Sequence, residues 1–111
     1  MGHEIGNHTM THPHMGQLSR DRQIWEILEA RRELESHGLC SDTVCYPYGE
    51  VGEPKALSSA GYRVGLALGR RRARVGDDLW RLPRIVVAYS DRLPMLLYKI
   101  HVKPKLLRSI G

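Results

Sequence analysis

The sequence lacks phenylalanine, has only two cysteines and contains no long apolar run. A membrane-spanning helix needs about 20 consecutive apolar residues, so the sequence predicts no transmembrane segment. Cys40 and Cys45 have no second pair to complete a four-cysteine zinc site. A short disulfide between them is one alternative. Two unpaired buried thiols are the expected state, because cysteine packs as a small hydrophobe.

Lysine is absent from residues 1–54, where four arginines face nine acidic residues and give a net charge of −5. Residues 55–111 carry thirteen lysines and arginines against three acidic residues, a net charge of +10. A basic half can attract nucleic acid, anionic lipid or acidic glycans. The densest run, Arg70 to Arg74, has no interleaved aromatic residue on which bases could stack. A solvated loop is therefore favoured, and specific nucleic-acid binding is not expected.

The length of 111 residues suits one small domain. We expect this domain over residues 1–102, followed by a basic tail over residues 103–111. Ser19 is a good helix N-cap and Gly38 a natural helix stop, and between them Ile24, Ile27, Leu28 and Leu34 recur at helical spacing. Strands are predicted near 3–7, 43–46, 62–67 and 82–89, and helices at 20–37, 54–61 and 92–100. This alternation predicts an α/β fold with parallel strands and covering helices.

Four of the six histidines fall within residues 3–14. Four positions separate His8 from His12, and on one helical turn that spacing puts both imidazoles on one face. Zinc accepts two histidines and one carboxylate and keeps a position open for water. By spacing alone, the pair fits a polar loop or a tag remnant as well as a metal site.

The string from Gly2 to His14 closely resembles a known motif, G-H-E-I-G-N-H-[ST]-x-[ST]-H-P. It is the second motif of the polysaccharide deacetylase family, the NodB-homology domain of the carbohydrate esterases. Tyr46-Pro47-Tyr48-Gly49 resembles the third motif of that family, and Ala60 to Val64 and Leu82 to Ile85 are similar to two of its strand segments. The resemblance spans about residues 2–88, and the four segments occur in the family's order.

This resemblance implies a partial, distorted (β/α) barrel and a hydrolytic activity. The reaction would remove N-acetyl groups from an N-acetylhexosamine polymer, or O-acetyl groups from xylan. A divalent metal ion, commonly zinc, would polarise the acetyl carbonyl. His8 and His12 match its two histidine ligands.

The same resemblance assigns further residues. The backbone N–H of Tyr48 would stabilise the oxyanion, and Thr9 and Thr11 would hold the metal loop by side-chain to backbone hydrogen bonds. His101 lies near the position of the family's histidine acid, although no aspartate follows it. The substrate cleft would be lined by His14, Tyr46, Pro47 and Gly49.

The family's first motif, T-F-D-D-G, supplies an aspartate base and the aspartate metal ligand, and it belongs upstream of Gly2. The sequence therefore resembles a C-terminal fragment of a deacetylase, and we expect it to be inactive or nearly so alone. The sequence is compatible with a location in the bacterial cytoplasm, the periplasm or at the cell surface.

Two alternatives differ in class from an enzyme. In the first, the chain is a carbohydrate-binding or complementing piece that pairs with a separate N-terminal half. In the second, which has less support, it is a basic nucleic-acid-binding module that uses Arg70 to Arg74.

Overall fold

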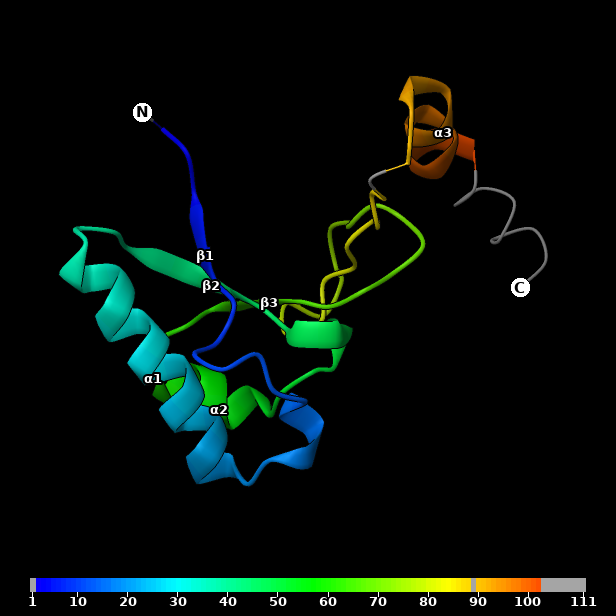
Figure 1. The fold of residues 1–111 in the computed structure, drawn as a ribbon. Helices are drawn as coiled ribbons and strands as arrows, with labels where there is room; N and C mark the ends of the chain where they lie inside the picture. The colour runs from blue at the N-terminus through cyan, green and yellow to red at the C-terminus, as the bar shows by residue number, and fades with distance from the viewer. Residues whose placement is uncertain (1, 89, 103–111) are drawn as a thin grey trace.

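The structure is a computed structural model that describes residues 2–88 and 90–102 (Figure 1). The predicted tail, residues 103–111, lies outside the described residues. The elements in chain order are β1 (Ile5–Asn7), the 3-10 turn η1 (Met15–Gln17), α1 (Arg20–Ser36), β2 (Ser41–Cys45), the 3-10 turn η2 (Pro47–Gly49), α2 (Pro54–Ser59), β3 (Val64–Leu66), α3 (Leu93–Leu97) and the π-helical turn η3 (Tyr98–Val102).

The three strands form one parallel sheet in the order β1-β2-β3. Helix α1 connects β1 to β2, α2 connects β2 to β3, and the two helices pack against each other (Figure 1). The predicted α/β alternation is confirmed in this part of the chain. Because parallel strands all end at the same edge of a sheet, the segments that begin at His8, Tyr46 and Ala67 start side by side.

The core lies between this sheet and the two helices. Met15, Ile27, Val44 and Leu57 are fully buried there, and Tyr62 is 2% exposed. These side chains come from η1, α1, α2, the central strand and the entry to β3, so the core joins these five parts of the chain. Their burial provides most of the driving force that a small domain has available.

Helix α1 has the predicted boundaries but not the predicted buried face. The Ser19 hydroxyl accepts a hydrogen bond from the Arg22 N–H at 3.2 Å, which confirms the N-cap. Gly38 has φ +74° just beyond the helix, as its stop role requires. The buried residues, however, are Gln23, Glu26, Ile27 and Ala30. Of the predicted apolar stripe only Ile27 is fully buried, because polar side chains of α1 reach inward to bind loops.

The strand predicted over residues 82–89 is wrong. Beyond one isolated bridge between Leu66 and Leu82, the described part of this segment belongs to no strand, and Val86 and Val87 are 54% and 60% exposed. Backbone hydrogen bonds join its first residues to β3 and the segment after it, from the Leu82 N–H to the Gly65 carbonyl and from the Gly69 N–H to the Arg84 carbonyl. The Arg84 guanidinium also donates to the carbonyls of Ala67 and Tyr46. β-Branched residues favour extended backbone, but these backbone bonds stop at Arg84, so residues 85–88 have no ladder partner among the described residues.

Cys40 and Cys45 both carry free thiols. The expected unpaired state is confirmed, whereas the expected burial is wrong: Cys40 is exposed and Cys45 is only partly buried. In the part of the chain that the structure describes, no helix combines the length and apolar character needed to cross a membrane.

Candidate metal centre

His8 follows directly on β1 and its ring orientation is fixed by β2. The His8 Nδ1 lies 2.6 Å from the carbonyl oxygen of Cys45. A carbonyl only accepts, so Nδ1 must carry the proton and donate. This tautomer leaves Nε2 with its lone pair, the state in which a histidine binds a metal ion.

His12 converges on His8 through a loop and not through a helical turn. The ring centroids of the two imidazoles are 4.8 Å apart in a T-shaped arrangement. Thr9 and His12 both have left-handed backbone, with φ of 69° and 59°. The N–H of His12 donates to the Thr9 hydroxyl at 3.2 Å, which confirms the side-chain to backbone bond expected of Thr9.

Asn7 anchors the start of this loop from the core. Its side-chain amide donates to the carbonyl of Ile27 at 3.0 Å and to the Tyr62 hydroxyl at 2.8 Å. Its side-chain oxygen accepts from the N–H of Thr9 at 2.8 Å. All three bonds form at a fully buried residue, so β1, α1 and the loop are fixed to one another at His8.

Glu26 of α1 holds the middle of the loop. One carboxylate oxygen accepts from the N–H groups of Met10 and Thr11, both at 2.9 Å, and the other accepts from the Thr11 hydroxyl at 2.5 Å. Thr11 therefore bonds a side chain and not the backbone, contrary to the expectation. Glu26 was not predicted from the sequence, because a glutamate on an amphipathic helix is normally assigned to its solvent face.

The turn at η2 places Tyr48 opposite the histidines. Tyr48 has φ 59°, and Gly49 follows with φ 71°. Pro47 has no N–H, and the N–H groups of Gly49 and Glu50 donate to the carbonyls of Tyr46 and Pro47. Among the described residues, the Tyr48 N–H has no backbone acceptor, and its oxyanion role stays a prediction.

The Tyr48 side chain is 54% exposed and joins the histidines in one aromatic group. Its ring centroid lies 4.8 Å from that of His12 and stacks on His14 at 4.0 Å with planes 7° apart. His14 Nδ1 in turn lies 2.7 Å from a carboxylate oxygen of Glu50. The structure therefore brings His8, His12, His14 and Tyr48 together.

The other predicted cleft residues lie deeper. Tyr46 is fully buried and its hydroxyl donates to the Trp80 carbonyl at 2.6 Å, while burial raises the pKa of that hydroxyl above its ordinary value. Pro47 is also buried, and Gly49 is half-buried. Tyr46 and Pro47 thus support the turn from within the protein, and Gly49 packs against Leu68.

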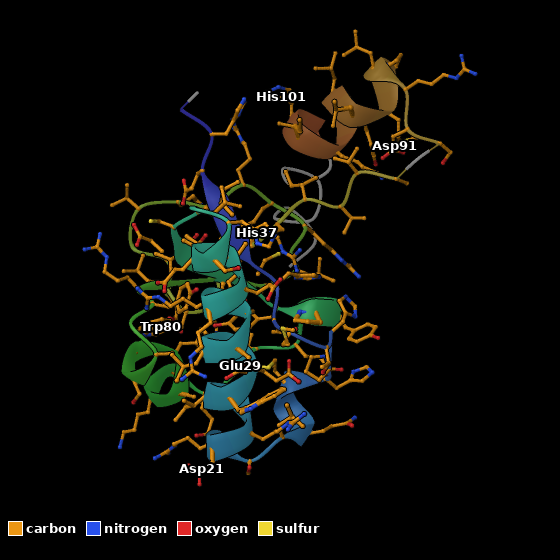
Figure 2. All side chains as sticks on the ribbon, turned by 60° about the vertical axis from the view of Figure 1, so that its left-hand side comes forward. Asp21, Glu29, His37, Trp80, Asp91 and His101 are labelled. Carbon is orange, nitrogen blue, oxygen red and sulfur yellow. The ribbon has the colours of Figure 1, made fainter. Side chains whose placement is uncertain are left out.

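His101 is not brought to this group. It is exposed on η3, and Figure 2 shows its segment standing apart from α1 and the residues labelled on it. Within residues 2–88 and 90–102, moreover, no group of three or more histidine, cysteine, aspartate or glutamate side chains could hold a metal ion. The pair of imidazoles fits two positions of a zinc site, and the described residues place no carboxylate in the third.

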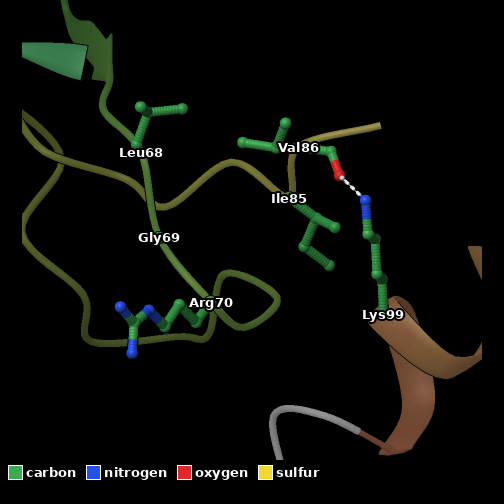
Figure 3. A pocket seen from close by; sticks show the side chains of 6 residues that line it. All are labelled: Leu68, Gly69, Arg70, Ile85, Val86 and Lys99. Atoms are coloured by element: carbon green, nitrogen blue, oxygen red, sulfur yellow. Dashed lines mark hydrogen bonds between the residues drawn. The ribbon is translucent and has the colours of Figure 1, made fainter. Parts of the chain in front are cut away.

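A cavity of about 490 Å³ lies beyond Leu68 (Figure 3). Its lining comes from the segment after β3, from the segment after Leu82 and from η3, namely Leu68, Gly69, Arg70, Ile85, Val86 and Lys99. The Lys99 ammonium donates to the Val86 carbonyl at 3.2 Å and to the Asp91 carboxylate at 2.5 Å. Both bonds tie η3 to the preceding segment. The bond from Lys99 to Asp91, followed by that from the Ala88 N–H, holds the pKa of Asp91 below its ordinary value.

The family profile described as polysaccharide deacetylase matches residues 1–65, more than half of the chain. This chain belongs to the polysaccharide deacetylase family. The match covers the loop from His8 to His12 (the metal loop), α1 and the Tyr48 turn. Members of the family are hydrolases that act on acetylated carbohydrate, and the family is generally metal-dependent.

Two solved structures are similar to this family member. The Streptococcus pyogenes deacetylase PplD, in complex with acetate, is 23% identical with a TM-score of 0.72, over 83% of this chain and 42% of that one. A family 4 carbohydrate esterase from Streptomyces lividans, in complex with acetate, is 26% identical with a TM-score of 0.50, over 61% of this chain and 36% of that one. The first shows the shared fold, and the chain spans less than half the length of either protein.

Proposed function

We propose that this chain contributes part of the metal-dependent active site of a hydrolase that removes N-acetyl groups from an N-acetylhexosamine polymer. The observation that carries the proposal is the His8–His12 pair, with rings 4.8 Å apart and the Nδ1 of His8 bonded to the Cys45 carbonyl. That carbonyl bond is the support that metal-binding histidines commonly have.

Each residue of the group has a distinct role in this proposal. His8 and His12 bind the metal ion through ring nitrogens, and zinc suits a neutral imidazole pair. When bound, the ion supplies Lewis-acid polarisation of the acetyl carbonyl and activates water. The Tyr48 N–H stabilises the developing oxyanion, while the exposed Tyr48 and His14 rings offer an apolar face to the sugar.

We further propose that the three described strands form one side of the family's distorted (β/α) barrel. The carboxylate ligand and the base would then come from a part of the barrel outside the described residues. A site with two imidazoles lacks both groups, so residues 1–111 alone should hydrolyse little or no substrate.

Purified residues 1–111 test this proposal in two measurements. Isothermal titration with Zn²⁺ should show one bound equivalent, and this binding should be lost in His8→Ala and in His12→Ala. It should be retained in the control His37→Ala, because the His37 ring bonds the Glu33 carbonyl at the far end of α1. Acetate release from acetylated glucosamine oligomers should be near background. Binding that His12→Ala leaves intact would contradict the metal site, and strong chelator-sensitive release would contradict the expected inactivity.

A second candidate function is a complementing piece that pairs with a separate N-terminal half. It is favoured by β1, which stands at an edge of the sheet in the described residues. Beside this edge, a cavity of about 380 Å³ is lined by residues of β1, the metal loop and α1. An added parallel strand would extend the sheet there and end beside His8.

A further inference from the structure

Glu26 carries a carboxylate into the interior of the protein. The residue is 1% exposed. A buried carboxylate is costly unless hydrogen bonds replace its water. Glu26 receives three such bonds, from the N–H groups of Met10 and Thr11 at 2.9 Å and from the Thr11 hydroxyl at 2.5 Å. Arg22 adds an ion pair at 3.7 Å, but its side chain is half exposed, so the loop is the principal partner of the carboxylate.

Met10 and Thr11 lie between His8 and His12 in the sequence. The residues that flank them, Thr9 and His12, have the left-handed backbone that side chains other than glycine rarely adopt. Such a conformation persists where the surrounding structure fixes it. Two consecutive N–H groups that point at one carboxylate oxygen fix the peptide units that separate His8 from His12.

We propose that Glu26 is the positioning residue of the metal loop. Its hydrogen bonds to Met10 and Thr11 hold His8 and His12 at the separation at which both bind one divalent ion. The inference rests on the proposed function, since it concerns the same histidine pair. Glu26 itself touches neither ring: it acts through the backbone of the loop.

Zinc affinity of residues 1–111, measured by isothermal titration, tests the inference. Glu26→Ala should bind Zn²⁺ about 10- to 100-fold more weakly, the usual loss when a residue that supports a metal ligand is removed. Glu26→Gln should lose less, because its amide oxygen can still accept from both N–H groups and its NH₂ can face the Thr11 hydroxyl. Glu29→Ala is the matched control, since Glu29 lies on the same helix (Figure 2) and its carboxylate pairs with Arg32.

Amide hydrogen exchange without metal separates positioning from general stability. In Glu26→Ala the N–H groups of Met10 and Thr11 should exchange faster, while that of Val44 in the core strand keeps its protection. Unchanged zinc affinity in folded Glu26→Ala overturns the inference. If that variant does not fold, Glu26→Gln and Thr11→Val decide it: each should bind Zn²⁺ more weakly than wild type, and unchanged affinity in both overturns the inference.

Failure of the proposed function gives a different result. A wild-type chain that binds no zinc contradicts the metal site itself. The loop-holding role of Glu26 is then decided by amide exchange alone, in which no metal takes part. Loss of Met10 and Thr11 protection in Glu26→Gln or Glu26→Ala supports that role, and full protection in both refutes it.

Discussion

At the residue scale, the histidines of the site are exposed and the side chains that hold them are buried. His8 and His12 face solvent, whereas Asn7 and Glu26 are 0% and 1% exposed. The sequence could predict the histidine pair, because clustered histidines and a specific motif are local signals. It could not predict Glu26, whose partners lie 15 and 16 residues away along the chain. A buried polar residue is recognisable only once its partners are placed.

Gly49 gives a prediction at this scale. It combines φ 71° with a close neighbour, since an added Cβ would lie 2.4 Å from the Leu68 Cγ. Gly38 has a similar φ of 74° but nothing within 4 Å of an added Cβ. Gly38→Ala should therefore lower the unfolding free energy by about 1–2 kcal/mol, which is the cost of left-handed backbone at a residue with a side chain. Gly49→Ala should cost about 1–3 kcal/mol more from overpacking.

Urea unfolding of the two variants measures the difference. The shared left-handed backbone cancels in the comparison, and what remains is the contact with Leu68. Equal losses would mean that the segment at Leu68 shifts freely, and that it does not constrain the Tyr48 turn.

At the element scale, the helix could be predicted and the last strand could not. The predicted helix over residues 20–37 matches α1 at Arg20–Ser36, because the Ser19 cap and the Gly38 stop act locally. The segment 82–89 has strand-like composition, but strand formation depends on pairing with residues distant in the chain. Among the described residues, backbone bonds to the segment after β3 reach only as far as Arg84, whose side chain also binds the carbonyls of Ala67 and Tyr46.

The arginine-rich loop that begins at Arg70 is held by hydrogen bonds between its own residues. The Arg71 guanidinium donates to both carboxylate oxygens of Asp77, at 2.8 and 2.7 Å, and the Arg74 N–H donates to the same carboxylate at 2.7 Å. The bond from Arg71, followed by that from the Arg74 backbone, lowers the pKa of Asp77 from 3.8 to about 2. Part of the basic run is thus paired internally, which weakens the reading of this loop as a nucleic-acid surface.

The lowered pKa of Asp77 predicts an acid-sensitive contribution to stability. In the unfolded chain Asp77 is protonated below about pH 4, whereas in the folded chain it stays ionised to about pH 2. Its contribution is therefore present above pH 4 and is lost as the pH falls through this window. The melting temperature of Asp77→Asn should be lower than wild type at pH 7 and should fall less between pH 4 and pH 2.

Asp42→Asn is the control for this experiment. Asp42 is exposed on β2, so its replacement removes the same charge without removing the Arg71 pair. Melting curves between pH 2 and pH 7 that are parallel for wild type and Asp77→Asn would show that the Arg71–Asp77 pair does not stabilise the folded chain.

At the scale of the whole molecule, the described residues form an open three-stranded sheet. The sequence predicted parallel strands with covering helices, because alternating elements have few other arrangements. Closure into a barrel is not a local property, since it depends on strands at both edges. The same reasoning applies to the proposed site: two imidazoles are local to one loop, whereas a third ligand would come from another strand.

The open edge at β1 leads to a prediction for two separate chains. Residues 1–111 mixed with a chain that carries the family's N-terminal T-F-D-D-G region should form a complex, because a parallel strand added beside β1 completes backbone hydrogen bonds at that edge. In the presence of Zn²⁺ the mixture should release acetate from acetylated glucosamine oligomers, and a chelator should stop the release. His12→Ala should still form the complex but give no release, because His12 lies on the loop and not on the edge. Sedimentation measures the complex and acetate release measures the site. Absence of a complex would refute pairing at β1, whereas an inactive complex would show that the added strand does not complete the site at His8 and His12.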